Sequence, residues 1–226
     1  MGEAVRKLHL VPDDGGNAGR VRRANLAQIL KAAEQVFAET GFNGATMAQI
    51  AETAALPKAN LHYYFGTKEE LYRAVLANTL EMWLAPLAAI RPDADPAQAI
   101  TEYVVAKMEA ARLRPWASKV FANEILHGAQ QIETFLSNDL KTLVEEKAAV
   151  LEGWIGQGRM GPVDPKAFFF MIWSMTQHYA DFDVQIRLLL GKRQLTRGDF
   201  AHFTDCVTRA VLLAAGLQPS STDGGG

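Results

Sequence analysis

Residues 46–72 read Thr-Met-Ala-Gln-Ile-Ala-Glu-Thr-Ala-Ala-Leu-Pro-Lys-Ala-Asn-Leu-His-Tyr-Tyr-Phe-Gly-Thr-Lys-Glu-Glu-Leu-Tyr, and this stretch predicts three consecutive helices. Thr46 and Gln49 have the spacing of a capping box, in which the hydroxyl accepts an amide proton three residues later and the Gln reaches back. Pro57 disfavours helical backbone at the residue before it and fits the first turn of a new helix, so it separates the first helix from the second. Thr67 begins a second capping box and opens the third helix.

Two short helices joined by a tight turn have the geometry that places one helix in the major groove of DNA. On the second helix, Lys58 and Tyr63 can contact phosphates. Asn60 and His62 can offer hydrogen bonds to base edges. An ordinary helical hairpin with a solvated polar face fits the same spacing. The predicted DNA-binding residues are Thr46, Lys58, Ala59, Asn60, His62, Tyr63 and Lys68.

A longer pattern consists of Phe42-x-Gly44-x-Thr46, Ile50-Ala51, Ala54, Lys58-x-Asn60-Leu61-x-Tyr63-Tyr64-Phe65 and Lys68-Glu69-x-Leu71. This pattern resembles the DNA-binding domain of the TetR family of transcriptional regulators over roughly residues 24–75. Two positions depart from the family pattern, because Ala55 stands where the family has a turn glycine and Pro57 where it has a Ser or Thr helix cap. The resemblance implies sequence-specific, ligand-responsive regulation, most often repression, by an all-α protein that binds operator DNA.

Composition and charge agree with a folded protein whose N-terminal end faces DNA. Of the 226 residues, 49% are hydrophobic and 21% charged, which predicts a packed core. The net charge is −2, yet residues 1–68 carry eight Lys and Arg against six Asp and Glu. A single cysteine, Cys206, excludes an internal disulfide and fits a reducing compartment. With neither a signal peptide nor a membrane-spanning stretch in the sequence, a cytoplasmic location is expected.

The fold class predicted from the helical periodicity is all-α, with a three-helix DNA-binding domain and a larger helical domain. We expect a disordered arm over residues 1–20, a helix-turn-helix domain over 21–66, a ligand-binding and dimerisation domain over 67–217 and a disordered tail over 218–226. The basic end of the arm, around Arg22, is either a solvated tail or a contact to phosphates or the minor groove.

The predicted helix over 165–190 carries apolar side chains on every face, including Phe170 and Trp173. A helix that is apolar all round is buried on all sides. One core of this size cannot easily cover such a helix. We therefore expect a homodimer formed by this helix and the last helix, 196–215.

Five residues beyond the predicted DNA-binding domain predict an effector site. Trp173 and Gln177 are four residues apart and share a helix face. A Trp ring can stack on a flat heterocycle, and a Gln amide can both donate and accept hydrogen bonds. Trp83 lies on the helix that follows Thr67. On a facing helix, Tyr103 and Lys107 are four residues apart and offer a hydroxyl and a charge. On spacing alone, two core tryptophans and a structural Gln fit as well. The predicted set is Trp83, Tyr103, Lys107, Trp173 and Gln177.

Residues 83–87 and 171–182 resemble the branch of the TetR family that regulates pyrimidine utilisation and responds to uracil and thymine. This resemblance implies a pyrimidine base as effector. A regulator of a different small molecule is the alternative, followed by a helical ligand-binding protein or enzyme without a DNA function. The sequence contains no metal-ligand spacing, phosphate-binding loop or nucleophile motif, so neither a cofactor nor catalysis is expected.

Overall fold

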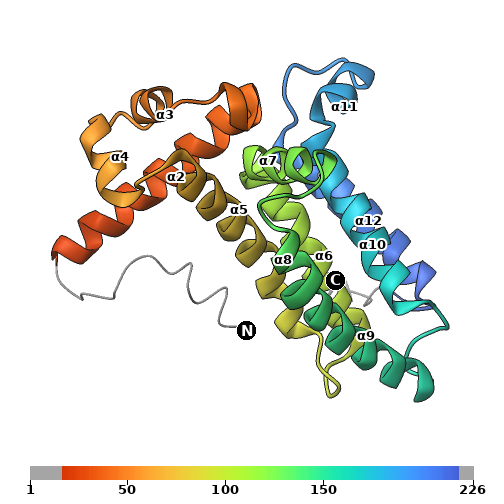
Figure 1. The fold of residues 1–226 in the computed structure, drawn as a ribbon. Helices are drawn as coiled ribbons and strands as arrows, with labels where there is room; N and C mark the ends of the chain where they lie inside the picture. The colour runs from red at the N-terminus through yellow and green to blue at the C-terminus, as the bar shows by residue number, and fades with distance from the viewer. Residues whose placement is uncertain (1–16, 219–226) are drawn as a thin grey trace. The chain divides into compact units, whose positions relative to one another are not determined.

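The computed structural model describes residues 17–218, which are helical and contain no β-strand (Figure 1). The predicted all-α fold is confirmed. None of the described helices is long and apolar enough to cross a membrane. The elements are α2 (Asn17–Gly44), α3 (Met47–Thr53), α4 (Lys58–Tyr64), α5 (Lys68–Leu84), η1 (Ala85–Ala89), α6 (Pro96–Leu113), α7 (Pro115–Leu126), α8 (Glu133–Phe135), η2 (Leu136–Leu140), α9 (Lys141–Gly156), α10 (Pro165–Asp181), α11 (Asp183–Leu189) and α12 (Arg197–Ala214).

The first helix is longer than the sequence predicts. Residues 17–20, expected in the disordered arm, already form the first turn of α2. The remainder of that arm lies outside the described residues, as does the predicted tail beyond Gln218. Gly41 has φ 71° and ψ 172°, which breaks the helix before its last residues. A positive φ of this kind favours glycine, and Gly41 ends the regular part of the helix.

The predicted helix starts are confirmed by side-chain caps. The Thr46 hydroxyl accepts a hydrogen bond from the Gln49 backbone N–H, and the Gln49 side-chain oxygen accepts one from the Thr46 backbone N–H. Asp164 accepts from the backbone of Ala167 at the start of α10. At the start of α6, Asp95 accepts a hydrogen bond from the Gln98 backbone N–H. The Gln98 side-chain amide donates to Glu102, so it does not complete a capping box. Each cap satisfies an amide that the first helical turn leaves without a partner.

The apolar periodicity predicts long helices over 67–90, 130–157 and 165–190, and all three are interrupted in the structure. The helix expected to reach Ile90 ends at Leu84, and Pro86 lies in the tighter helix η1. The helix expected over 130–157 contains the π-helical segment η2, whose i→i+5 bonding a period of 3.6 residues cannot reveal. The helix expected over 165–190 breaks at Phe182, which separates α10 from α11.

The described chain divides into two compact units, and the division differs from the predicted domain boundary near residue 66. One unit contains the chain up to Glu81 together with Trp116–Asp139. Its core includes Ile29, Phe37 and Leu61 of the N-terminal helices, and also Val120 of α7. The second unit contains Met82–Pro115 and the chain from Leu140 onward.

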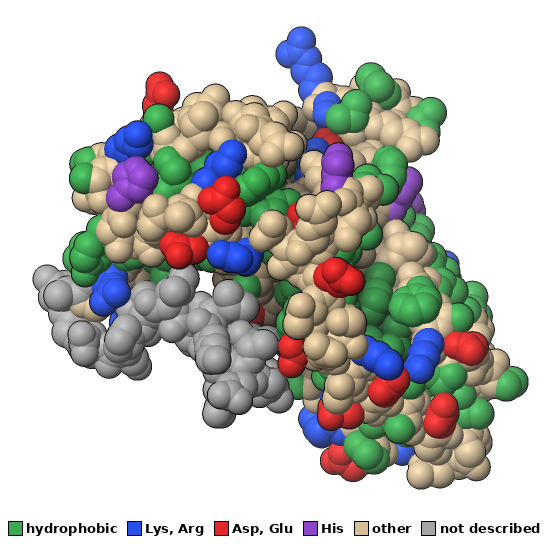
Figure 2. Space-filling view, in the orientation of Figure 1, with side chains coloured by type: hydrophobic (Ala, Val, Ile, Leu, Met, Phe, Trp, Pro, Cys, Tyr) green, Lys and Arg blue, Asp and Glu red, His purple; other side chains and the backbone are tan. Residues whose placement is uncertain are grey.

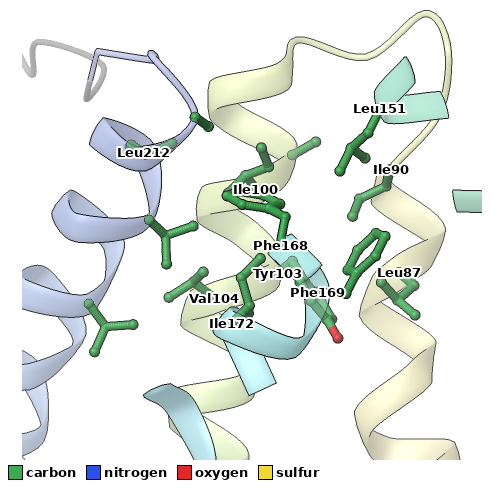
Figure 3. Close-up of a cluster of buried hydrophobic side chains, with 14 of the residues drawn as sticks. Leu87, Ile90, Ile100, Tyr103, Val104, Leu151, Phe168, Phe169, Ile172 and Leu212 are labelled. Atoms are coloured by element: carbon green, nitrogen blue, oxygen red, sulfur yellow. The ribbon is translucent and has the colours of Figure 1, made fainter. Parts of the chain in front are cut away.

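The core of the second unit is built from η1, α6, α9, α10 and α12. Figure 3 shows Ile100, Tyr103 and Val104 of α6 among side chains from the surrounding helices. Phe169 and Ile172 of α10 meet them and are almost completely buried. This packing fixes α6 and α10 side by side, which positions the predicted effector residues on both helices.

Candidate functional site

The helix-turn-helix is held together by a small apolar core. Ile50 of α3 and Leu61 of α4 are completely buried, and Phe65 follows them just beyond α4. The turn between the helices is fixed from outside, because the Gln28 amide of α2 donates to the Ala54 carbonyl oxygen. Pro57 is the residue before α4, with φ −57° and ψ 139°, and provides no side-chain cap. The first amides of α4 are therefore not bound by a side-chain cap.

Leu61 faces inward and Tyr64 packs partly against the core, while most other side chains of α4 face outward. Lys58, Ala59, His62 and Tyr63 are exposed, and Asn60 is half-buried. Figure 2 shows basic and histidine side chains gathered over this helix. Tyr63 is 72% exposed, which is high for an aromatic residue of a folded domain. The helix thus presents hydrogen-bonding and cationic groups to the outside without a neighbouring carboxylate in its own sequence.

Arg22 of α2 lies next to this surface. Its guanidinium carbon is 5.9 Å from the centre of the Tyr63 ring. The Tyr64 hydroxyl is 3.5 Å from the carbonyl oxygen of Arg22, which brings α2 and α4 together at this end. The sequence predicts Arg22 at the basic end of the N-terminal arm. Only the fold brings it beside Tyr63.

Lys68 already has partners within the protein. Its ammonium donates to the carbonyl oxygens of Phe42 at 2.7 Å and Ala45 at 3.0 Å. The same nitrogen is 4.5 Å from the centre of the Phe42 ring. Because an ammonium has three N–H groups, one remains for a further acceptor. Lys68 therefore orders the loop that leads into α3, a role that its sequence position did not reveal.

Two of the predicted effector residues form a hydrogen bond between α6 and α10. The indole N–H of Trp173 donates to the Tyr103 hydroxyl oxygen at 2.7 Å. Phe169 lies beside both rings, with centroid distances of 6.5 Å to Tyr103 and 6.4 Å to Trp173. Tyr103 is 1% exposed, and burial raises the pKa of its hydroxyl well above the usual value. The hydroxyl is therefore neutral and retains its proton as a donor.

The other contact joins Lys107 to Trp83. The ammonium nitrogen lies 4.1 Å from the centre of the Trp83 ring, and these side chains are only 4% and 6% exposed. A cation over an indole face is an attractive arrangement that gains strength when water is excluded. Burial lowers the pKa of Lys107 to about 7, whereas the negative charge of Asp181 acts in the opposite direction. Lys107 is thus a buried amine that lies on one aromatic face and loses its proton more readily than an exposed lysine.

The effector cluster, defined here as Trp83, Tyr103, Lys107, Trp173, Gln177 and Asp181, lies within the second unit. Tyr103 and Lys107 are one turn apart on α6, so the two contacts are joined through that helix. Gln177 is half-buried, one turn after Trp173, and no hydrogen bond to its amide occurs within residues 17–218. Asp181 was absent from the predicted set, although its spacing of four residues from Gln177 was a visible signal.

Comparison with protein families assigns both parts of the chain. Residues 29–75 match bacterial regulatory proteins of the tetR family, and residues 76–219 match the C-terminal region of YcdC-like proteins. The HTH-type transcriptional regulator RutR of Escherichia coli (strain K12) is 42% identical over 204 residues, which cover 90% of this chain and 95% of the relative. The HTH-type transcriptional repressor NicS of Pseudomonas putida is 35% identical over 132 residues, covering 58% of this chain and 61% of NicS.

Solved structures share the fold at low sequence identity. Apo AibR aligns with a TM-score of 0.63 and 19% identity, covering 86% of this chain and 98% of AibR. AibR in complex with isovaleryl coenzyme A and operator DNA aligns with a TM-score of 0.61 and 18% identity, with the same coverage. At these identities the likeness establishes a common fold.

Proposed function

The chain belongs to the TetR family of bacterial regulatory proteins and is a DNA-binding transcriptional regulator, and we propose that it is a repressor released from its operator by a pyrimidine base such as uracil or thymine. The observation that carries the effector proposal is a pair of contacts, Trp173 with Tyr103 and Lys107 with Trp83, whose members on α6 are one turn apart. It combines flat aromatic faces with hydrogen-bonding groups, which a small polar heterocycle requires. Residues 83–87 and 171–182, which resemble the pyrimidine-utilisation branch, contribute two of these side chains.

We propose that residues 21–66 contact the operator through the exposed face of α4. Lys58 and Tyr63 bind phosphates, while Asn60 and His62 lie near base edges. The third N–H of Lys68 can reach a phosphate while its other two hold the loop before α3. The exposure of these α4 side chains and the absence of acidic residues from α4 support this assignment.

A gel-shift series over several salt concentrations tests the DNA contacts. Lys58→Ala should weaken binding to all sequences and reduce the salt slope by about 1, because one phosphate contact is lost. Lys68→Ala should do the same and should also lower the melting temperature, since the loop contacts disappear. Asn60→Ala should change base preference more than total affinity. Wild-type binding by all three variants would refute the assignment, and Lys141→Ala, a change of an exposed lysine in α9, is the control.

The cluster is closed in this structure, which suggests how an effector acts. The Lys107 ammonium lies on the Trp83 ring, and Trp173 is bonded to Tyr103. A ring that stacks on the same face of Trp83 must displace the ammonium and separate side chains of α5 and α6. Trp83 belongs to α5, whose first residue, Lys68, follows the helix-turn-helix directly. An effector that binds only the rearranged cluster weakens operator binding by the same coupling, typically about 1–3 kcal/mol.

A thermal-shift screen of nucleobases and amino acids tests the effector class, because a ligand that binds only the native state raises the melting temperature. Uracil or thymine should give the largest shift and should release the operator. Gln177→Leu should keep the fold and operator binding but abolish release, since the polar edge of the ligand loses its partner. Gln157→Leu, which alters an exposed Gln after α9, should respond as the wild type does. Unchanged release of Gln177→Leu would place the pocket elsewhere.

We also propose that the regulator is a homodimer formed through α10 and α12. The support is the apolar surface that these helices leave exposed, with Phe170, Phe182 and Leu213 each more than half exposed. A two-fold dimer presents two copies of α4 to successive turns of one DNA face. The operator should therefore be nearly palindromic, with half-sites about 34–36 Å apart or a multiple of this.

A further inference from the structure

A hollow of the second unit lies between α6 and α12. Its volume is about 520 Å³, which falls within the range of small-ligand sites, about 300–1,000 Å³. Its lining extends from Thr101 to Arg112 along α6 and from Arg197 to Thr208 along α12. Each of these stretches covers about 16 Å of helix at about 1.5 Å per residue. The hollow is therefore elongated, and none of its lining residues belongs to the effector cluster.

Two arginines line the same end of this hollow. Leu212, near the end of α12, lies beside Ile100, near the start of α6 (Figure 3). The two helices therefore run in opposite directions, so Arg197 at the start of α12 lies toward Arg112 at the end of α6. The pKa of Glu109 agrees with this placement. It lies below its usual value mainly because Arg112 donates to the carboxylate, and the charge of Arg197 acts in the same direction.

One positive charge at this end has no partner. Arg112 donates to Glu109 from Nε at 2.7 Å and from Nη2 at 2.6 Å, which forms a bidentate pair. Asp205, the other carboxylate of the lining, accepts from Arg209 at 2.6 Å. Arg197 is exposed, and its side chain makes no hydrogen bond or ion pair within residues 17–218. Because both carboxylates are paired, the hollow has a surplus of one positive charge.

The pair with Glu109 also orients Arg112 for a second acceptor. A guanidinium has five N–H groups in one plane, and a bidentate pair uses only two of them. The Nη1 group of Arg112 is therefore available in a plane that Glu109 holds fixed. A carboxylate matches the fork of N–H groups that a guanidinium presents. One carboxylate placed between Arg112 and Arg197 could accept from both and would neutralise the surplus charge.

Beyond the charged end, the lining of the hollow is largely apolar. Met108 and Phe200 are buried and form part of it. Val105 also lines the hollow but is 44% exposed, although valine is among the residues most often buried. An apolar chain that lies along the hollow would cover Val105 and remove apolar surface from water. A small inorganic anion would satisfy the charge but leave this surface uncovered.

We propose that the hollow between α6 and α12 is a second ligand site, which binds a small amphipathic carboxylate. The carboxylate lies between the guanidinium groups of Arg112 and Arg197. The apolar chain of the ligand lies over Met108, Phe200 and Val105. This inference goes beyond the proposed function and does not depend on it, because the site shares no residue with the effector cluster.

Calorimetric titration of the full chain with octanoate, octanamide and acetate tests the proposal. The wild type should bind octanoate at least about tenfold more tightly than octanamide, which lacks the charge, and than acetate, which lacks the apolar chain. Arg197→Gln should bind octanoate at least about tenfold more weakly. Its melting temperature without ligand should equal that of the wild type, because the Arg197 side chain has no bond to lose. Arg193→Gln removes another exposed arginine, four residues earlier, and should bind octanoate as the wild type does.

Two further variants separate the parts of the site. Val105→Ser removes exposed apolar surface and should weaken octanoate while leaving the affinity for acetate unchanged. Gln177→Leu alters the effector cluster and should bind octanoate with wild-type affinity.

Four results would overturn the proposal. They are a wild type that does not bind octanoate, equal affinities for octanoate and octanamide, an Arg197→Gln variant with wild-type affinity for octanoate, and a loss of octanoate binding in Gln177→Leu. The last result would place the carboxylate in the effector cluster instead. A failure of the proposed function is distinguishable, because a protein that binds no pyrimidine should still bind octanoate at this site.

Discussion

Two alanines adopt a backbone conformation that normally favours glycine. Ala55, in the turn of the helix-turn-helix, has φ 49°, and Ala129, after α7, has φ 57°. A side chain in the left-handed region is strained by roughly 1–2 kcal/mol. Ala55 stands where the family pattern has glycine, so the departure seen in the sequence has a measurable physical cost. The left-handed turn itself is retained.

The first prediction is that Ala55→Gly stabilises the protein. Relief of the strained φ should raise the unfolding free energy by about 0.5–1 kcal/mol, after allowance for the greater freedom of glycine in the unfolded chain. Ala27→Gly, in the middle of α2, should instead cost about 1 kcal/mol, because its backbone is helical. Urea titration of both variants checks the opposite signs. A destabilised Ala55→Gly variant would show that the turn is not strained.

The second prediction concerns Lys107 and pH. Burial lowers its native pKa from 10.5 to about 7, so the unfolded chain binds one more proton than the native chain between about pH 7 and 10.5. The contribution of this residue to stability therefore rises with pH through that window and is constant below it. Lys107→Met should be more stable than the wild type at pH 7, and its advantage should shrink by up to about 1.4 kcal/mol per pH unit as pH rises.

Urea titrations at pH 7, 8 and 9 measure this difference. Subtracting the wild type from the variant removes the contributions of other titrating groups. Lys141→Met, which alters an exposed lysine of α9, should give a difference that does not change with pH. An equally flat difference for Lys107→Met would mean that the ammonium keeps its ordinary pKa in the native protein.

At the scale of elements, α7 joins the N-terminal unit through a buried polar contact. The Tyr72 hydroxyl of α5 donates to Glu124 of α7 at 3.0 Å, and Glu124 is 7% exposed. The other carboxylate oxygen accepts the Gln131 backbone N–H at 2.7 Å. Burial and the nearby carboxylate raise the pKa of Tyr72, so the hydroxyl stays protonated as the donor. Since α6 leads directly into α7, the helix that carries Tyr103 is continuous in sequence with an element of the DNA-binding unit.

The third prediction is that this contact stabilises the N-terminal unit. Tyr72→Phe should lower the unfolding free energy by about 1–3 kcal/mol, because a buried carboxylate loses a hydrogen-bond donor. Glu124→Gln should also destabilise, and the double variant should lose less than the two single losses together. Tyr64→Phe removes a hydroxyl that makes only a 3.5 Å contact and should change little. Strictly additive losses in the double-mutant cycle would argue that the two side chains do not interact.

At the scale of the whole molecule, the exposed apolar surface of the C-terminal helices calls for a partner. Phe170 of α10 and Leu213 of α12 are 57% and 59% exposed. Leu188 and Leu189 of α11 are exposed still further, and Figure 2 shows hydrophobic side chains at the surface of this region. Exposed apolar patches of this kind mark interaction surfaces in folded proteins.

The fourth prediction is that the wild type is a dimer and that Phe170→Glu combined with Leu213→Glu makes it a monomer. Light scattering should give twice the chain mass of 24.8 kDa for the wild type and the chain mass for the variant. The variant should lose operator affinity, because each monomer reads only one half-site. Its melting temperature should also fall, because the partner subunit no longer stabilises the native chain. Leu126→Glu, at an exposed position of α7, should remain dimeric. A monomeric wild type at micromolar concentration would contradict the proposed dimer.

The sequence alone determined the features that depend on neighbouring residues. The helix start at Thr46 followed from its capping box with Gln49, and the separation of the two short helices followed from Pro57. The motif of residues 46–72 carried the family and the function for the same reason, because a helix-turn-helix is a local structure. The inward position of Leu61 and the outward position of Tyr63 also followed from helical periodicity.

Only the tertiary structure decided which distant side chains meet and in what state. The contact between Lys107 and Trp83, the bond between Trp173 and Tyr103 and the partners of Lys68 join residues that no local pattern relates. Burial by surrounding helices sets the pKa of Lys107, and the packing of α7 assigns it to the N-terminal unit. Long-range packing depends on the whole chain at once. The two contacts of the effector cluster are therefore properties of the fold.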